Sequence, residues 1–195
     1  VNTHNEEYKT AMHDTVNQLE NEKDLTGVVL TSAKKVFFAG ADLNELILAD
    51  ASHAGVIYQN LLDVKADMRR LELLPVPVVA AINGSALGGG YELCLACNHR
   101  VAFDHPSVKI GFPECNLGLF PAGGGVVRLT NLIGVQSALD IILRSKQMTS
   151  RKALSCELVD QLVDEIDELV PTAKKWIQDN QIDPTAKTQP WDRKG

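Results

Sequence analysis

The chain has 195 residues, 45% of them hydrophobic, and a formal net charge of −6. A chain of this size suits one globular domain, because it buries roughly 70% of the surface that its unfolded form exposes. The acidic balance argues against non-specific binding to nucleic acid or to anionic membranes, and no apolar run approaches the ~20 residues that span a bilayer.

The apolar pattern predicts helices that alternate with short strands. Helical spacing runs over residues 5–22 and 54–74, and short apolar, β-branched runs predict strands over 25–32, 75–84 and 99–104. Because strands and helices alternate, the α/β class is expected.

Glycine-rich turns separate the remaining elements. A helix is expected over 91–98, after a run of three glycines, and residues 108–125 are expected to be irregular. Further helices are expected over 125–134, 136–145, 150–160 and 168–180, the last interrupted by Pro171, before a tail or linker from 183 onward. A boundary near 145–150 would divide a core of residues 1–148 from a purely helical region and tail, 149–195.

The four cysteines are sparse and stand mostly in apolar surroundings, which predicts a reduced, intracellular protein. Cys94 and Cys97 form a C-x-x-C pair, but zinc needs a second ligand pair, and Cys115 and Cys156 are isolated. Cysteine packs as a small hydrophobe in an apolar helix, so core packing is favoured over metal or redox chemistry.

The five histidines show no ligand spacing, and surface or turn positions are expected for most of them. The start of the chain is polar, without a signal-peptide pattern or an initiator Met, so we expect a fragment or a processed form.

Two glycine runs, GSALGGG and PAGGGVVR, match neither the dinucleotide nor the phosphate-loop pattern. Glycines before a helix let the backbone approach a ligand closely and point N–H groups at it, and simple turn geometry is the alternative. GSALG is also not the nucleophile motif of hydrolases, so Ser85 is a weak candidate.

Two acids stand in apolar company, Glu92 in an expected helix and Glu114 in GFPECNLGLF. Two such carboxylates could share one site, where burial would raise their pKa values and prepare one as acid and the other as base. The alternatives are a first-turn acid favoured by the helix dipole for Glu92 and a solvated loop charge for Glu114.

Three stretches, FFAGADLNEL, PVVAAINGSALGGGYELCLACNHRVA and GFPECNLGLFPAGGGVVRL, resemble the crotonase superfamily, specifically enoyl-CoA hydratases. They stand in the family's order and at its separations, and the resemblance covers nearly the whole chain. GGGYELCLACNHRVA and QPWD look closest to the hydratase part of multifunctional fatty-acid-oxidation proteins. The implied fold is α/β, a crotonase (ClpP-like) spiral of ββα units with a C-terminal helical region.

The resemblance implies roles for individual residues. The backbone N–H groups of Ala39 and Gly89 would form an oxyanion hole for the thioester carbonyl, and Glu92 and Glu114 would be the catalytic acid/base pair. Residues 39–42 would lie along the CoA moiety. The implied substrate-binding set is Ala39, Gly40, Ala41, Asp42, Leu43, Gly88, Pro113, Leu117 and Phe120, with Phe112 as a further candidate for the acyl pocket.

The implied activity is that of an enoyl-CoA hydratase, which adds water across the 2,3 double bond of 2-enoyl-CoA thioesters in fatty acid β-oxidation. No metal or redox cofactor is expected, since coenzyme A is part of the substrate. A Δ3-Δ2-enoyl-CoA isomerase is the nearest alternative, although two glutamates favour hydration. A non-catalytic acyl-CoA-binding module is a second alternative, and an RNA-binding role is disfavoured by the acidic charge.

The expected partner is an acyl-CoA thioester, with no nucleic acid and no membrane. The family also implies a homo-oligomer, trimer or hexamer, or fusion to a 3-hydroxyacyl-CoA dehydrogenase domain. The expected location is the cytoplasm in a bacterium and the mitochondrial matrix or peroxisome in a eukaryote. The chain departs from the family in carrying Pro121-Ala122 where Pro-Gly is usual. The family's first strand or hairpin normally lies before Val1, and its C-terminal helices are only partly represented.

Overall fold

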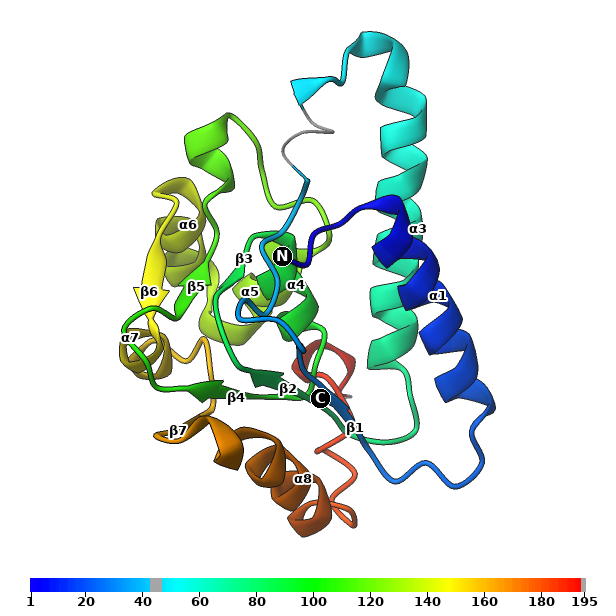
Figure 1. The fold of residues 1–195 in the computed structure, drawn as a ribbon, viewed down its shortest axis with the longest axis vertical. Helices are drawn as coiled ribbons and strands as arrows, with labels where there is room; N and C mark the ends of the chain where they lie inside the picture. Colours follow the sequence, from blue (N-terminus) through cyan, green and yellow to red (C-terminus); the bar gives the residue numbers. More distant parts are fainter. Residues whose placement is uncertain (43–46, 194–195) are drawn as a thin grey trace.

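The computed structural model describes residues 1–42 and 47–193. Its centre is a parallel four-stranded sheet in the order β1-β2-β4-β7, and a three-stranded sheet in the order β3-β5-β6 stands beside it (Figure 1). The strands are β1 (Val28–Leu30), β2 (Val78–Ile82), β3 (Ala86–Leu87), β4 (His99–Phe103), β5 (Lys109–Gly111), β6 (Gln147–Thr149) and β7 (Gln161–Val163).

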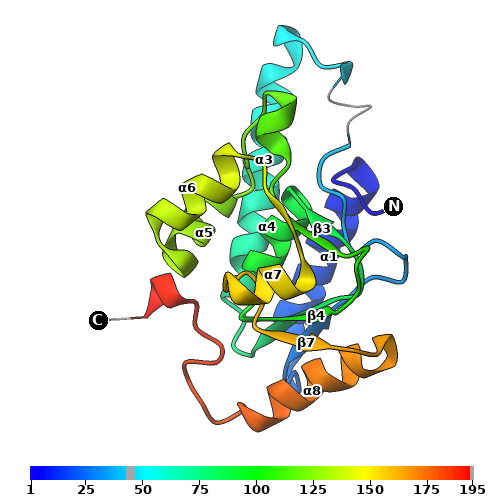
Figure 2. The same cartoon turned by 90° about the vertical axis from the view of Figure 1, so that its left-hand side faces the viewer.

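Helices cover both faces of the four-stranded sheet, with α8 on one face and α4 and α7 on the other (Figure 2). The α-helices are α1 (Glu6–Asn21), α3 (Ala54–Glu72), α4 (Gly89–Leu95), α5 (Gly125–Ile133), α6 (Val135–Leu143), α7 (Ser150–Ser155) and α8 (Leu169–Asp179). Short 3₁₀ helices include η2 (Glu114–Leu117) and η4 (Pro190–Asp192). In the described part of the chain, no helix combines the length and apolar character needed to cross a membrane.

Strand β2 is buried along its whole length, and its side chains alternate between two cores. Val79 and Ala81 pack in a small cluster with Ala173 of α8. Val78 and Ala80 point to the other face and belong to the main core. A strand covered on both faces needs a continuous apolar run rather than an alternating one, which is what the sequence PVVAAI supplies.

The strongly periodic segments fold as the sequence predicts. The helices expected over 5–22 and 54–74 are confirmed as α1 and α3, and the strands expected over 25–32, 75–84 and 99–104 are confirmed as β1, β2 and β4, each shorter than expected. Helix α1 begins where the Asn5 side chain accepts a hydrogen bond from the Tyr8 N–H, which satisfies one of the free donors at the helix start.

The C-terminal quarter departs from the expectation in two ways. It is not purely helical, because Gln161–Val163 form β7, which extends the parallel sheet beyond β4. Pro171 does not interrupt its helix either. It is the third residue of α8, and a proline in the first turn lacks only an N–H that would have no partner inside the helix.

The segment expected to be a tail or linker, from residue 183 to residue 193, packs against the rest of the fold. Gln189 is 2% exposed and donates from its side-chain nitrogen to the Ala96 carbonyl. Asp192 accepts two hydrogen bonds from the Arg69 guanidinium. This C-terminal segment therefore lies against α3 and the end of α4.

The C-x-x-C pair lies in the core, as expected. Cys94 and Cys97 are fully buried, and each thiol donates to a carbonyl four residues earlier, in Gly90 and Leu93. Burial raises the pKa of the Cys97 thiol to about 12, so it stays protonated and unreactive. Their neighbour Tyr91 is also fully buried, and its hydroxyl donates to the Leu158 carbonyl at 2.7 Å.

We predict that Tyr91→Phe lowers the free energy of unfolding by ~1–3 kcal/mol, because the buried Leu158 carbonyl then loses its partner. Urea denaturation monitored by circular dichroism measures this change. Tyr58→Phe, at a tyrosine that is 65% exposed, is the matched control and should leave the unfolding midpoint unchanged. Equal midpoints for the two variants would contradict a structural role for the Tyr91 hydroxyl.

Candidate active site

The Glu92 carboxylate is held by two backbone N–H groups at the start of α5. The Gly123 N–H donates to one oxygen at 3.0 Å, and the Gly125 N–H donates to the other at 2.7 Å. Glu92 is only 4% exposed. Glu92 does lie in the first turn of its own helix, α4, as the alternative interpretation supposed. Its carboxylate is buried, however, and faces the positive end of α5.

The second glycine run has a steric reason, and we call Gly123–Gly125 the glycine cradle. A Cβ added at Gly123 or Gly125 would lie 2.8 Å from atoms of the Glu92 side chain. Gly124 has a φ of +106°, which side chains rarely adopt. The run therefore lets the backbone wrap a carboxylate rather than merely turn.

Glu114 is the first residue of the 3₁₀ helix η2. A Cβ added at Gly88, just before α4, would lie 2.7 Å from Glu114 Oε1. Glu114 Oε2 is buried and has no hydrogen-bond partner among the described residues. Glu114 is thus not the fully solvated loop charge of the alternative interpretation.

Burial raises the pKa of both carboxyl groups, and the charge of Glu92 also acts on Glu114. Burial raises the pKa of Glu92, and the N–H groups of Gly125 and Gly123 oppose this effect. Burial raises the pKa of Glu114 to about 7, and the negative charge of Glu92 adds to the rise. The two carboxyl groups therefore lie close enough to interact, as expected. Both oxygens of Glu92 accept backbone N–H bonds, whereas Glu114 Oε2 has no partner among the described residues.

One predicted oxyanion donor is not available in the structure. The Ala39 N–H donates to the Asn2 carbonyl at 2.9 Å, so the expectation that it faces a substrate is wrong in this conformation. No hydrogen bond among the described residues uses the Ala41 N–H. Residues 39–42 nevertheless lie beside the second predicted donor, because a Cβ added at Gly40 would lie 3.3 Å from the Gly89 nitrogen.

His4 lies against the second predicted donor, although the sequence indicated no role for the histidines. A Cβ added at Gly89 would lie 2.5 Å from His4 Nε2 and 3.7 Å from Glu92 Oε2. The His4 ring packs against Tyr8 and Phe38, and burial lowers its pKa to about 4. The imidazole is therefore neutral near pH 7, and nothing in its sequence context signalled burial.

Four of the remaining predicted substrate residues fall into three groups. Phe112 is fully buried against Tyr91, so it belongs to the core and does not line an open acyl pocket. Leu117 and Phe120 are 54% and 48% exposed, which leaves them free to contact a ligand. Leu43 lies outside the described residues.

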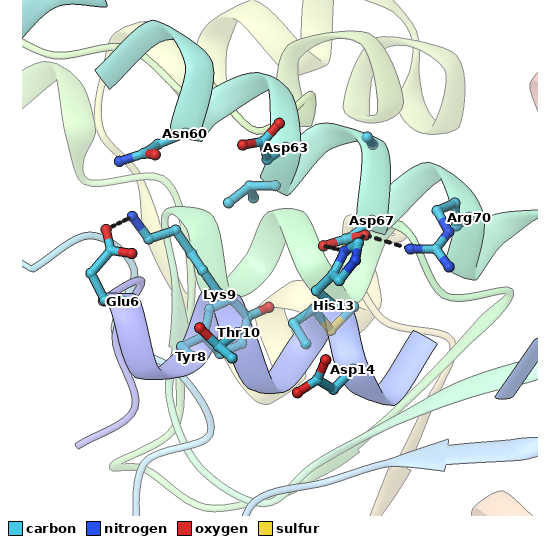
Figure 3. Close-up of a pocket in the computed structure, with 13 residues that line it drawn as sticks. Glu6, Tyr8, Lys9, Thr10, His13, Asp14, Asn60, Asp63, Asp67 and Arg70 are labelled. Atoms are coloured by element: carbon cyan, nitrogen blue, oxygen red, sulfur yellow. Dashed lines mark hydrogen bonds and ion pairs between the residues drawn. The ribbon is translucent and has the colours of Figure 1, made fainter. Parts of the chain in front are cut away.

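Two hollows of the described surface lie away from this region. A groove of about 550 Å³ opens between α1 and α3, where Lys9, Asp63 and Arg70 are among the lining side chains (Figure 3). A second hollow of about 570 Å³ lies after β1 and β2, beside Lys35 and His105. None of the predicted site residues lines either one. In the described residues, no group of three or more histidines, cysteines and acids could hold a metal ion.

Sequence reasoning missed the residues that hold Glu92. Gly123 and Gly125 stood in a recognised glycine run, but nothing linked that run to Glu92, 31 and 33 residues away. Arg128 was not singled out at all, although it is 7% exposed and donates to the Gly123 carbonyl. The available signal was a single arginine within the apolar, helix-like run GVVRLTNLI.

A family model and several solved structures match this chain. Residues 1–189 match the family model described as enoyl-CoA hydratase/isomerase. An enoyl-CoA hydratase from Bacillus anthracis is 32% identical, with a TM-score of 0.82 over 91% of this chain and 67% of that chain. An enoyl-CoA hydratase from Thermoplasma volcanium is 31% identical, with a TM-score of 0.80 over 93% and 69%.

A third enoyl-CoA hydratase, from Geobacillus kaustophilus, is 28% identical, with a TM-score of 0.83 over 92% of this chain and 66% of that chain. The chain thus spans about two thirds of the length of the solved structures it matches.

The raised pKa of Glu114 makes stability depend on pH. The folded protein binds this proton more tightly than the unfolded chain, whose glutamate titrates at ~4.3. The resulting stabilisation is complete below that value and is lost as the pH rises through about 7. Glu114→Gln, which stays neutral, should therefore raise the melting temperature more at about pH 8 than at about pH 5.

Thermal unfolding of the native chain and of Glu114→Gln at both pH values tests this expectation. Glu165→Gln, at an exposed glutamate, is the control and should give the same small difference at both. A Glu114→Gln effect that does not change with pH would contradict the raised pKa.

Proposed function

The chain belongs to the enoyl-CoA hydratase/isomerase family of the crotonase superfamily, and on this premise we propose that it hydrates 2-enoyl-CoA thioesters. The α/β crotonase fold expected from the sequence is confirmed. Within the proposal, the substrates are the 2-enoyl-CoA thioesters of fatty acid β-oxidation, and water adds across the 2,3 double bond.

The observation that carries the proposal is the unequal pair of carboxyl groups. Glu92 has both oxygens on backbone N–H groups, an arrangement that favours the ionised form and suits a base. Glu114 has a pKa of about 7 and an oxygen without a partner, so it can hold a proton and suits an acid. The two carboxyl groups thus differ in their hydrogen-bond partners, and such a difference in environment is a usual basis for dividing acid and base roles.

In the proposed reaction, Glu92 takes a proton from water while the water oxygen forms a bond to C3 of the substrate. The electron pair of the double bond passes toward the thioester, and Glu114 delivers its proton to C2. The product is a 3-hydroxyacyl thioester. Glu92 is left protonated and Glu114 ionised, and exchange of a proton between them through water restores the starting state.

We place the oxyanion donors at Gly89 and Ala41. Negative charge develops on the thioester oxygen, and two N–H donors aimed at it would stabilise the transition state. Among the described residues, neither N–H donates to a backbone acceptor, whereas the Ala39 N–H is bonded to Asn2. The approach of Gly40 to the Gly89 nitrogen supports donors from these two segments.

Δ3-Δ2-isomerisation is the alternative that the family itself retains. It needs one carboxylate that removes a proton from C2 and returns it at C4. The partnerless oxygen of Glu114 favours hydration, since a second group that accepts or donates a proton is useful only when water is added.

We predict that Glu92→Gln and Glu114→Gln each lower kcat for hydration of crotonyl-CoA by about 10²–10⁴-fold, because each removes one proton-transfer group. Binding of the CoA thioester should change little. Loss of the ultraviolet absorbance of the conjugated thioester measures hydration, and a 3-enoyl-CoA in parallel measures isomerisation. Glu165→Gln is the control. Near-native hydration in both glutamine variants would exclude the acid/base pair.

We predict that replacing the amide at Gly89 or at Ala41 with an ester, through glycolic or lactic acid at that position, lowers kcat by about 10²–10³-fold, since each ester removes one oxyanion donor. An ester at Ala39 removes the bond to Asn2 and should lower stability with a much smaller effect on kcat. If the Ala39 ester were the damaging one for kcat at native-like fold, the donor assignment would be reversed.

A further inference from the structure

Arg128 connects the glycine cradle to a buried acid on a different helix. Its Nη1 donates to the Gly123 carbonyl at 2.8 Å, and its Nε donates to Glu72 of α3 at 2.6 Å. Arg128 is 7% exposed and Glu72 is 4% exposed. The same Nη1 fills the place that a side chain at Gly124 would need, since a Cβ there would lie within contact of that nitrogen.

Glu72 does not depend on Arg128 alone. Its second oxygen accepts from Arg69 at 2.9 Å, and Arg69 is clamped in turn by both oxygens of Asp192. Each charge in this series has an opposite charge beside it, which is the condition under which buried ions persist. The ion pair with Glu72 of α3 therefore holds the Arg128 guanidinium in the orientation in which it contacts the glycine cradle.

We infer that Arg128 is a positioning residue: by holding the Gly123 carbonyl, it fixes the cradle whose N–H groups orient the Glu92 carboxylate. The peptide groups on either side of Gly123 are used in both directions, with the carbonyl bound to Arg128 and the N–H bound to Glu92. A planar guanidinium can serve Glu72 and Gly123 at once, whereas a lysine ammonium is a point donor on a flexible stem.

A further effect is electrostatic. Glu92 is faced by Arg128 from α5, by Lys65 from α3, by Glu114 from η2 and by His4 beside Gly89. Burial raises the pKa of Glu92, whereas the cradle N–H groups and the charges of Arg128 and Lys65 lower it. The charge of Glu92 in turn raises the pKa of Glu114. Loosening the cradle weakens the N–H bonds to the ionised carboxylate, so the Glu92 pKa should rise when Arg128 is replaced.

The test is a direct titration of Glu92 by ¹³C NMR of labelled glutamate carboxyls, with the Glu92 signal assigned by its absence in Glu92→Gln. In Arg128→Lys, which keeps the charge, we expect the Glu92 pKa to rise by about one unit. We also expect kcat for hydration to fall while KM stays nearly constant. Arg100→Lys is the matched control, since Arg100 is equally buried and ion-paired, with Asp160, but does not contact the cradle.

A second variant guards against misfolding. Replacing Arg128 alone with an apolar residue would leave one oxygen of the buried Glu72 without a partner, because Arg69 contacts only the other oxygen. The double variant Glu72→Gln/Arg128→Met therefore removes both charges together. We expect it to fold and to raise the Glu92 pKa further than Arg128→Lys. An unchanged Glu92 titration in either folded variant overturns the inference, as does an equal change in Arg100→Lys.

The inference rests on the proposed function only for its kinetic readout. If the native chain fails to hydrate any enoyl-CoA, the proposed function fails, while the NMR titration still decides whether Arg128 positions Glu92. If hydration is present and Arg128→Lys leaves both the titration and kcat unchanged, the proposed function stands and the inference falls.

Discussion

The structure depends on a buried carboxylate resting on two backbone N–H groups. An ionised group that is 4% exposed loses most of its hydration, and burial of a charge without partners is strongly unfavourable. The N–H groups of Gly123 and Gly125 replace the lost water. They can do so only if α5 begins at that point and if no Cβ intervenes, so this one carboxylate constrains where α5 can lie against α4.

The sequence correctly predicted the helices and strands whose apolar pattern is visible within the element itself. Helices α1 and α3 carry a 3.6-residue apolar period over many turns, and β2 is a continuous apolar run, so their type could be read directly. Strands β6 and β7 have three residues each and, unlike β1, do not belong to a longer β-branched run, so only pairing with other segments makes them strands. No period can emerge from so short a segment, which is why the region after residue 145 was expected to be helical.

The site residues that the sequence could identify are likewise those whose signal lies in their own segment. Glu92 and Glu114 could be found because a charged residue in an apolar segment is unusual wherever it occurs. Ala39 could not be judged, because the direction of its N–H is decided by pairing with Asn2, 37 residues earlier in the chain. Arg128 could not be linked to Glu72, since an ion pair between α5 and α3 leaves no pattern in either helix.

The two glycine runs acquire one explanation when they are considered together. The first run leaves room for Glu114 at Gly88, and the second leaves room for Glu92 at Gly123 and Gly125. Each carboxyl group is thus received by the backbone that precedes a helix, yet only Glu92 receives N–H bonds on both oxygens. The similar steric design and the different hydrogen bonding together produce the asymmetry that acid–base chemistry needs. The carboxyl group with two donors keeps its charge more readily, and the one with a partnerless oxygen keeps its proton.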